Sequence, residues 1–143
     1  MAVVRTTFSL SCIDRYGNAA PFIVECLNWP QREGAPEAWE FRVRPEDASA
    51  TTDFFMLTLE RVSVHDGRVV AMSNHEEPGV SAKGIPDALL TAAARRLCLA
   101  IQSSPTKGEG AVFRTARATR VWQRLMARTL AAYDPHTDVF RLV

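Results

Sequence analysis

The sequence predicts a single α+β domain, with one mostly antiparallel sheet of about six to seven strands and two main helices in the C-terminal half. Three observations support this prediction. Residues 1–73 contain short runs in which apolar and polar side chains alternate, as they do in half-buried strands. Residues 80–143 instead alternate between helical and strand-like patterns. A chain of 143 residues also has the usual length of one domain.

The N-terminal half is expected to form two hairpins with a separate strand between them. The expected strands are 8–12, 21–27, 39–43, 54–64 and 68–72. Residues 14–18 form the first turn, and residues 28–38, rich in proline, glycine and polar side chains, form a loop. The dipeptide Asp66–Gly67 provides the turn of the second hairpin, where positive φ is needed. The apolar phase changes near Glu60, which indicates a bulge or a bend.

A helix followed directly by a buried strand is predicted after this sheet. Pro86 suits the first turn of a helix, because its missing N–H is not needed there and its φ is already helical. Asp87 lies near the positive end of the helix dipole, and Arg95 and Arg96 lie near the negative end. The apolar run Cys98–Ile101 then predicts a covered strand, which ends at the turn residues that follow it.

A second, longer helix is expected from Phe113 to about Ala132. Its apolar stripe consists of Ala118, Trp122, Leu125, Met126 and Leu130. The opposite face is expected to carry the arginines Arg114, Arg117, Arg120, Arg124 and Arg128. Asp134 and Pro135 are expected to end the segment, and the alternating residues 139–143 form a last strand.

Charge divides the chain, although the net charge is only +1. Residues 1–94 carry 8 basic and 13 acidic side chains, a net −5, whereas residues 95–143 carry 9 and 3, a net +6. The basic part is suited to hold an anionic ligand or a partner surface, or to complement the acidic part within one domain. No apolar run approaches membrane-spanning length, and the first residues do not resemble a signal peptide. We therefore expect a cytoplasmic protein without a membrane partner.

Cysteine and histidine are too sparse to indicate a disulfide framework or a metal site. The three cysteines lie in apolar runs, so we expect buried thiols, with Cys12 and Cys26 placed so that they could face each other across a hairpin. His65, His75 and His136 lie far apart and lack the spacing of a metal-binding motif. We expect no metal cofactor.

The loop Ser81–Ile85 leads into the N-terminus of the first helix, where backbone amides most readily hold a phosphate or a carboxylate. The alternative is that Gly84 only allows a tight approach to the helix. From the Asp66–Gly67 hairpin onward, the order is strand, glycine-bearing loop, helix, strand, helix, strand. This order resembles the C-terminal half of the GCN5-related N-acetyltransferases, a family that binds acetyl-CoA at a Gln/Arg-x-x-Gly-x-Gly/Ala loop. Gly84 matches that pattern, whereas Ser81 and Pro86 depart from it.

The resemblance implies an acyl-CoA-dependent N-acyltransferase, either active or degenerate. It implies contacts to acetyl-CoA or another CoA ester from Ser81, Ala82, Lys83 and Gly84, with Ser103 as a candidate at a strand end. The family also carries an Ala-x-x-x-Tyr helix whose tyrosine often serves as general acid. Ala118 and Trp122 have this spacing, but an indole does not deliver a proton to a leaving thiolate. The resemblance therefore names no general acid or base.

Two non-enzymatic alternatives remain open at the level of sequence. The arginine face of the second helix superficially resembles a nucleic-acid recognition helix, because arginine suits phosphate. An overall pI near 7.8 argues against strong nucleic-acid binding. The other alternative is a protein-interaction or immunity-type module, whose partner would meet either the basic helix or the exposed edge of the N-terminal sheet.

Overall fold

The computed structural model describes residues 3–47, 55–73, 84–107 and 114–143. Its strands form one sheet of eight, in the order β1-β2-β3-β4-β5-β6-β8-β7. The strands are β1 (Val4–Ile13), β2 (Ala19–Trp29), β3 (Ala38–Pro45), β4 (Phe55–Arg61), β5 (Asp66–Ser73), β6 (Ala100–Gln102), β7 (Ala131–Asp134) and β8 (Val139–Leu142). The helices are α1 (Ile85–Leu97) and α2 (Ala116–Ala127). The predicted α+β class is confirmed, with one strand more than the upper end of the expected number.

Strands β1 to β5 form an antiparallel meander, each paired with the next along the chain. The first turn is held by Asp14, whose Oδ1 accepts the backbone N–H groups of Tyr16 and Asn18, both at 2.9 Å. The predicted hairpin is confirmed. In the resulting register, the residue opposite Cys12 is Ala20, and the residue opposite Cys26 is Thr6. The two thiols therefore do not face each other directly across the hairpin, contrary to one sequence expectation.

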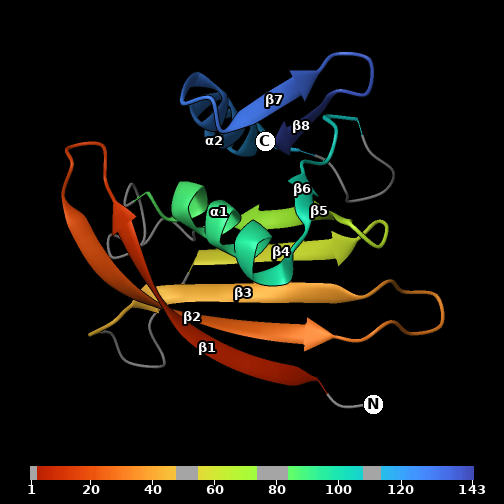
Figure 1. The fold of residues 1–143 in the computed structure, drawn as a ribbon, viewed down its shortest axis with the longest axis horizontal. Helices are drawn as coiled ribbons and strands as arrows, with labels where there is room; N and C mark the ends of the chain where they lie inside the picture. Colours follow the sequence, from red (N-terminus) through yellow and green to blue (C-terminus); the bar gives the residue numbers. More distant parts are fainter. Residues whose placement is uncertain (1–2, 48–54, 74–83, 108–113) are drawn as a thin grey trace.

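The core lies on one face of this meander. On β3, the side chains of Trp39, Phe41 and Val43 are buried, whereas the intervening polar side chains are only partly covered. Their cross-strand partners on β4 are buried as well, so the same face is apolar on both strands. Helix α1 packs against the sheet, as Figure 1 shows, and fully buries Ile85, Leu89, Leu90 and Ala93. Burial of this apolar stripe holds α1 in place.

The turn between β4 and β5 differs from the prediction. Residues 62–65 form it, and the N–H of Val62 donates to the carbonyl of Asp66 at 2.8 Å. Asp66 and Gly67 already belong to β5, and Gly67 is not among the described glycines with positive φ. A Cβ at Gly67 would lie 3.2 Å from Cδ1 of Leu99. This glycine therefore allows a close approach between β5 and the residues before β6, and it does not form the turn.

A register shift between Thr58 and Leu59 confirms the irregularity predicted near Glu60. Thr58 pairs with Ala71, and Leu59 pairs with Val69, so Val70 is the extra residue. The bulge thus lies on β5 rather than on the long arm where the apolar phase changes. A bulge of this kind bends and twists its strand locally.

The strand predicted from Cys98 is shorter and starts later. Cys98 caps the C-terminus of α1 in the left-handed conformation, with φ 53, and its side chain is exposed. The N–H groups of Cys98 and Leu99 both donate to the carbonyl of Ala94, which ends the helix. The expectation that Cys98 is buried in a strand is therefore wrong, whereas Cys12 and Cys26 are buried as expected.

The second helix is also shorter than predicted. The side chain of Thr115 caps it by accepting the N–H of Ala118 at 3.1 Å. It ends near Arg128, because Thr129 adopts φ 59 and the N–H of Leu130 donates back to the carbonyl of Leu125. The next residues form β7, which pairs with β8, so they are not helical. Met126, expected on the apolar stripe, is 42% exposed.

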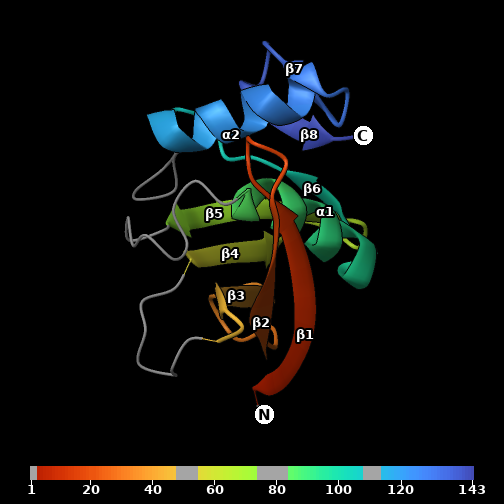
Figure 2. The same ribbon diagram turned by 90° about the vertical axis from the view of Figure 1, so that its left-hand side faces the viewer.

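The C-terminal elements gather at one end of the molecule. Figures 1 and 2 show α2, β7 and β8 together beyond β5, with the N-terminus at the opposite end. The β5–β6 pair is parallel, whereas the other strand pairs among the described residues are antiparallel. A parallel pair requires a crossover connection, and α1 lies within it. This junction positions the candidate site.

Candidate ligand pocket between β5 and α2

The site forms where β5 and β6 part. The two strands pair only at Asp66–Ala100, Gly67–Ile101 and Arg68–Gln102. Strand β5 then continues beside β4 as far as Ser73, whereas β6 ends at Gln102. The N–H of Ser103 donates to the carbonyl of Phe140 at 2.8 Å, so the chain after β6 follows β8 instead of β5. The divergence leaves a gap that α2 closes from one side.

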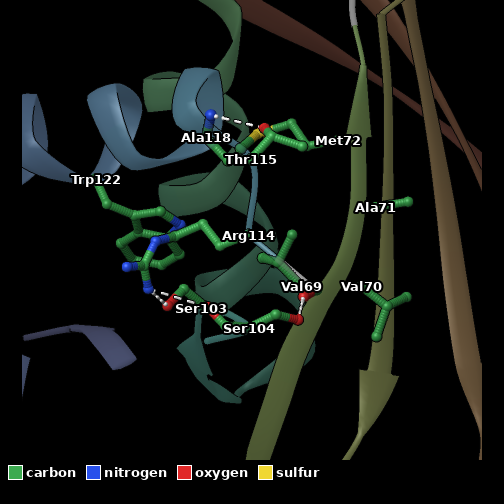
Figure 3. A pocket seen from close by; sticks show the side chains of 10 residues that line it. All are labelled: Val69, Val70, Ala71, Met72, Ser103, Ser104, Arg114, Thr115, Ala118 and Trp122. Carbon is green, nitrogen blue, oxygen red and sulfur yellow. Dashed lines mark hydrogen bonds between the residues drawn. The ribbon is translucent and has the colours of Figure 1, made fainter. Parts of the chain in front are cut away.

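A cavity of about 210 Å³ occupies this position. Its walls come from β5, from the segment after β6 and from α2, as Figure 3 shows. The lining residues are Val69, Val70, Ala71, Met72, Ser103, Ser104, Arg114, Thr115, Ala118 and Trp122. Most of these side chains are apolar. In Figure 3, Ser103, Ser104 and Arg114 lie toward one end, and Thr115 lies beside Ala118 and Met72 at the other.

Two buried serines join the walls of the pocket. The Ser104 hydroxyl donates to the carbonyl of Val69 at 2.5 Å, which connects β5 to the segment that follows β6. The Ser103 hydroxyl accepts the N–H of Phe140 at 2.9 Å. Each hydroxyl thus serves a backbone group that the divergence of the strands would otherwise leave without a partner. Serine is short enough to do this at the end of a strand.

Arg114 lies behind the serines, and its side chain is only 4% exposed. Its Nη1 donates to the carbonyls of Ser104 and Asp138 at 3.0 and 2.8 Å and lies 3.3 Å from the Ser103 hydroxyl. Its Nη2 donates to Asp138 Oδ1 at 2.8 Å, and its Nε donates to the hydroxyl of Thr119 at 2.8 Å. A guanidinium with so many acceptors is a structural cation that joins α2 to the β7–β8 hairpin.

Asp138 completes this network. Its carboxylate accepts the side-chain hydroxyl of Thr106, Arg114, the Thr106 backbone N–H at 2.8 Å and the hydroxyl of Tyr133 at 2.8 Å. These donors, with the Thr106 hydroxyl first, hold the pKa of Asp138 well below its usual range. The hydrogen bond between Tyr133 and Asp138 also raises the pKa of Tyr133, because the phenol donates to a carboxylate. The group is therefore arranged to stay ionised and to hold the hairpin.

Trp122 forms the floor of the pocket on the α2 side. The residue is fully buried, and its ring stacks on Phe140 with centroids 6.0 Å apart. Its indole nitrogen is buried and has no hydrogen-bond partner among the described residues. In Figure 3 this nitrogen lies on the side of the ring turned toward β5. A buried donor without an acceptor is uncommon in folded proteins.

The pocket can bind a ligand but offers little for proton transfer. Among the described lining residues, Arg114 is the only ionisable one, and it is already paired. The set has no carboxylate, histidine, cysteine or tyrosine that could act as an acid or a base. Its hydroxyls are bound to backbone groups. The chemistry that this arrangement supports is the enclosure of a mostly apolar group next to one free N–H donor.

No family model, curated protein or solved structure matches this chain. The pocket must therefore be interpreted from its own geometry. Within the described ranges, no cluster of histidine, cysteine or acidic side chains is arranged to hold a metal ion. Neither of the two described helices is long and apolar enough to cross a membrane.

The residues that sequence analysis selected for cofactor contact fall in different places. Ser81, Ala82 and Lys83 lie outside the described residues. Gly84 precedes α1 with φ 75, and a Cβ there would lie 2.1 Å from the carbonyl oxygen of Ile13. The need for glycine is thus accounted for by the close approach of β1 to the start of α1. Ser103 does line the pocket, at the end of β6 as expected.

The predicted arginine face is present on α2, but without one of its members. Arg117, Arg120, Arg124 and Arg128 are exposed, and Arg124 and Arg128 reach Asp87 of α1 at 2.9 and 3.6 Å. Arg114 precedes the helix and is buried, so the expectation that it shares this face is wrong. Extending the helical spacing back to residue 114 caused the error, because the helix starts only after Thr115.

Sequence reasoning did not identify the β5 wall or the role of Trp122 in the pocket. Nothing in the run Val69–Met72 distinguishes it from any other half-buried strand. The spacing of Ala118 and Trp122 resembles a family motif, and both residues line the pocket. The unpartnered indole N–H, however, is visible only in the folded chain.

Proposed function

We propose that this protein binds an acyl-CoA ester and that the acyl end of this cofactor enters the pocket between β5 and α2. The main support is the position of the cavity, at the divergence of the parallel strands β5 and β6. There β5 continues beyond its partner, and a ligand can lie along its edge in the manner of an added strand. Ser103, which sequence analysis named for this role, lies in the wall.

The lining residues fit the acyl end of such a ligand. Val69, Met72 and Ala118 provide apolar contact, and the cavity is smaller than the roughly 300–1,000 Å³ of pockets that enclose a whole drug-sized ligand. It is therefore suited to one end of a long cofactor. A bound acyl-CoA ester would supply an acyl group activated as a thioester. The chain's own residues would enclose that group and exclude water from it.

The proposal is one of binding, and transfer of the acyl group to an amine is left to experiment. The described lining residues contain no candidate acid or base. The basic charge of the C-terminal part, a net +6 over residues 95–143, favours the approach of an anionic cofactor. A degenerate acyltransferase that keeps its cofactor site is consistent with these features.

Calorimetric titration with acetyl-CoA and CoA tests the proposal. Moderate salt is used so that the basic part of the chain does not bind anions non-specifically. We expect saturable micromolar binding. In a Met72→Trp variant, the larger side chain would narrow the pocket, because the side chain of Met72 points from β5 toward Thr115 in Figure 3, and we expect affinity to fall by about tenfold or more. Met126→Trp is the matched control, because Met126 is exposed on α2 and does not line the pocket.

Two results would count against the proposal. If wild-type protein binds neither ligand, the chain has no CoA site, and the exposed arginines of α2 become the place to look for a protein or nucleic-acid partner. If Met72→Trp and Met126→Trp bind acetyl-CoA equally well, the cofactor does not use this pocket.

A further inference from the structure

The indole N–H of Trp122 is a polar group that the fold buries without giving it an acceptor. Trp122 is fully buried, lines the pocket and has no hydrogen-bond partner among the described residues. Its ring is held on one side by Phe140. Folding therefore strips water from this donor and returns nothing for it within the described part of the chain. Such a group is retained at a cost, unless a molecule in the pocket supplies the acceptor.

None of the hydroxyls around the pocket lies within hydrogen-bond distance of the indole nitrogen, and each is held in place by a backbone hydrogen bond. The Ser104 hydroxyl donates to Val69, and the Ser103 hydroxyl accepts from Phe140. The Thr115 hydroxyl accepts the N–H of Ala118 as the helix cap. One of these oxygens could accept the indole N–H only if its side chain turned toward the ring, which would break that backbone hydrogen bond. The missing acceptor is therefore expected to come from a ligand.

The pocket restricts the chemistry of that ligand. The indole N–H only donates, so the ligand must present an acceptor. Arg114, the only cation among the described lining residues, is committed to Asp138 and to backbone carbonyls, so the pocket has no spare charge for a carboxylate or phosphate. The remaining walls are mostly apolar. A neutral carbonyl on a narrow linear chain satisfies all three conditions.

We propose that the Trp122 indole N–H donates a hydrogen bond to the carbonyl oxygen of a linear thioester or amide that enters the pocket. This deepens the proposed acyl-CoA function and rests on it for the identity of the natural ligand. Trp122 then positions the ligand along β5 and transfers no proton. A ligand with a carbonyl at this depth would bind more tightly than one with a methylene group, because the methylene group would leave the indole N–H unpaired.

Nitrogen NMR of the indole groups tests this directly. The chain has three tryptophans, and a Trp122→Phe variant identifies the resonance of Trp122 by its loss. Wild-type protein would be titrated with acetyl-CoA and, separately, with S-acetyl-N-acetylcysteamine, a small neutral thioester that also carries an amide. We expect both to shift the Trp122 indole resonance saturably and to leave those of Trp29 and Trp39 in place.

A second variant separates the hydrogen bond from packing, because Trp122→Phe removes part of a fully buried ring. Replacing Trp122 with β-(3-benzothienyl)alanine keeps the bicyclic shape and substitutes sulfur for the N–H. We expect the affinity of this protein for acetyl-CoA to fall about tenfold, the equivalent of one neutral hydrogen bond. S-ethyl-CoA is a thioether that lacks the thioester carbonyl. Its affinity for the wild-type protein therefore shows the effect of removing the same hydrogen bond from the ligand.

The outcomes separate this inference from the proposed function. If acetyl-CoA binds in calorimetry but the Trp122 resonance does not move, or the sulfur variant binds as tightly as wild type, the inference fails and the proposed function stands. If acetyl-CoA does not bind but the small thioester shifts the Trp122 resonance, the inference stands and the CoA assignment fails. If acetyl-CoA does not bind in calorimetry and neither ligand moves the resonance, both fail.

Discussion

Replacement of Gly84 tests whether this glycine is required by packing. It has φ 75, and an added Cβ would lie 2.1 Å from the carbonyl oxygen of Ile13 and 3.0 Å from its carbon. A residue other than glycine pays about 1–2 kcal/mol for the left-handed conformation. Forcing an extra carbon into a packed contact costs a further ~1–3 kcal/mol. We therefore expect Gly84→Ala to lower the free energy of unfolding by about 2–5 kcal/mol.

Gly17→Ala is the matched control. Gly17 also has positive φ, 83, but a Cβ there would meet nothing within 4 Å. Its replacement should cost only the conformational part, about 1–2 kcal/mol. The change that alanine makes to the unfolded chain is common to both variants and cancels in the comparison. The difference between the two variants therefore measures the contact with Ile13.

Urea unfolding of both variants, followed by tryptophan fluorescence without any ligand, provides the measurement. We expect Gly84→Ala to be the less stable by about 1–3 kcal/mol, with unchanged dependence on urea concentration. A difference below about 0.5 kcal/mol would show that β1 does not press on the start of α1, and the packing explanation of Gly84 would be refuted.

Two further predictions concern the carboxyl group of Asp138 and the three cysteine thiols. Because the pKa of Asp138 is depressed in the folded state, the stability it provides is present above the ordinary value of 3.8 and is lost as the pH falls below it. Asp138→Asn should thus cost about 1–3 kcal/mol in urea unfolding at pH 7, and the gap to wild type should narrow below pH 4; a gap independent of pH would contradict this. Burial raises the pKa of the Cys12 and Cys26 thiols to about 11, whereas Cys98 is exposed. Ellman's reagent at pH 8 should therefore label one thiol rapidly, and none in Cys98→Ser, until the protein unfolds; rapid labelling of a second thiol would count against the burial.

Local patterns predicted most of the elements correctly. Alternation identified β1, β3 and β8, because a strand with one covered face shows it in every second residue. Proline near the start and arginines near the end bounded α1 almost as observed. These signals depend only on neighbouring residues and on which face is covered. They can therefore be recognised without knowing which element packs against the strand or helix.

The errors arose where distant contacts decide the conformation. The sequence after Met126 is rich in alanine and suits a helix, but pairing with β8 makes Ala131–Asp134 a strand. Gly67 follows an aspartate as in a tight turn, yet pairing with β6 places both residues in β5. Arg114 follows the spacing of an exposed arginine stripe, yet Asp138 and the end of β6 bury it.

The sequence by itself determined the fold class, the order of most elements and the unequal distribution of charge. Only the tertiary structure decided where a ligand could bind. The pocket exists because β6 leaves β5 after a few residue pairs and α2 closes the gap, and its walls come from segments far apart in the chain. Likewise, whether the Trp122 N–H finds an acceptor depends on every neighbour that the fold brings around it. Periodicity reports that a side chain is covered, but the group that covers it is set by packing between elements that no local pattern connects.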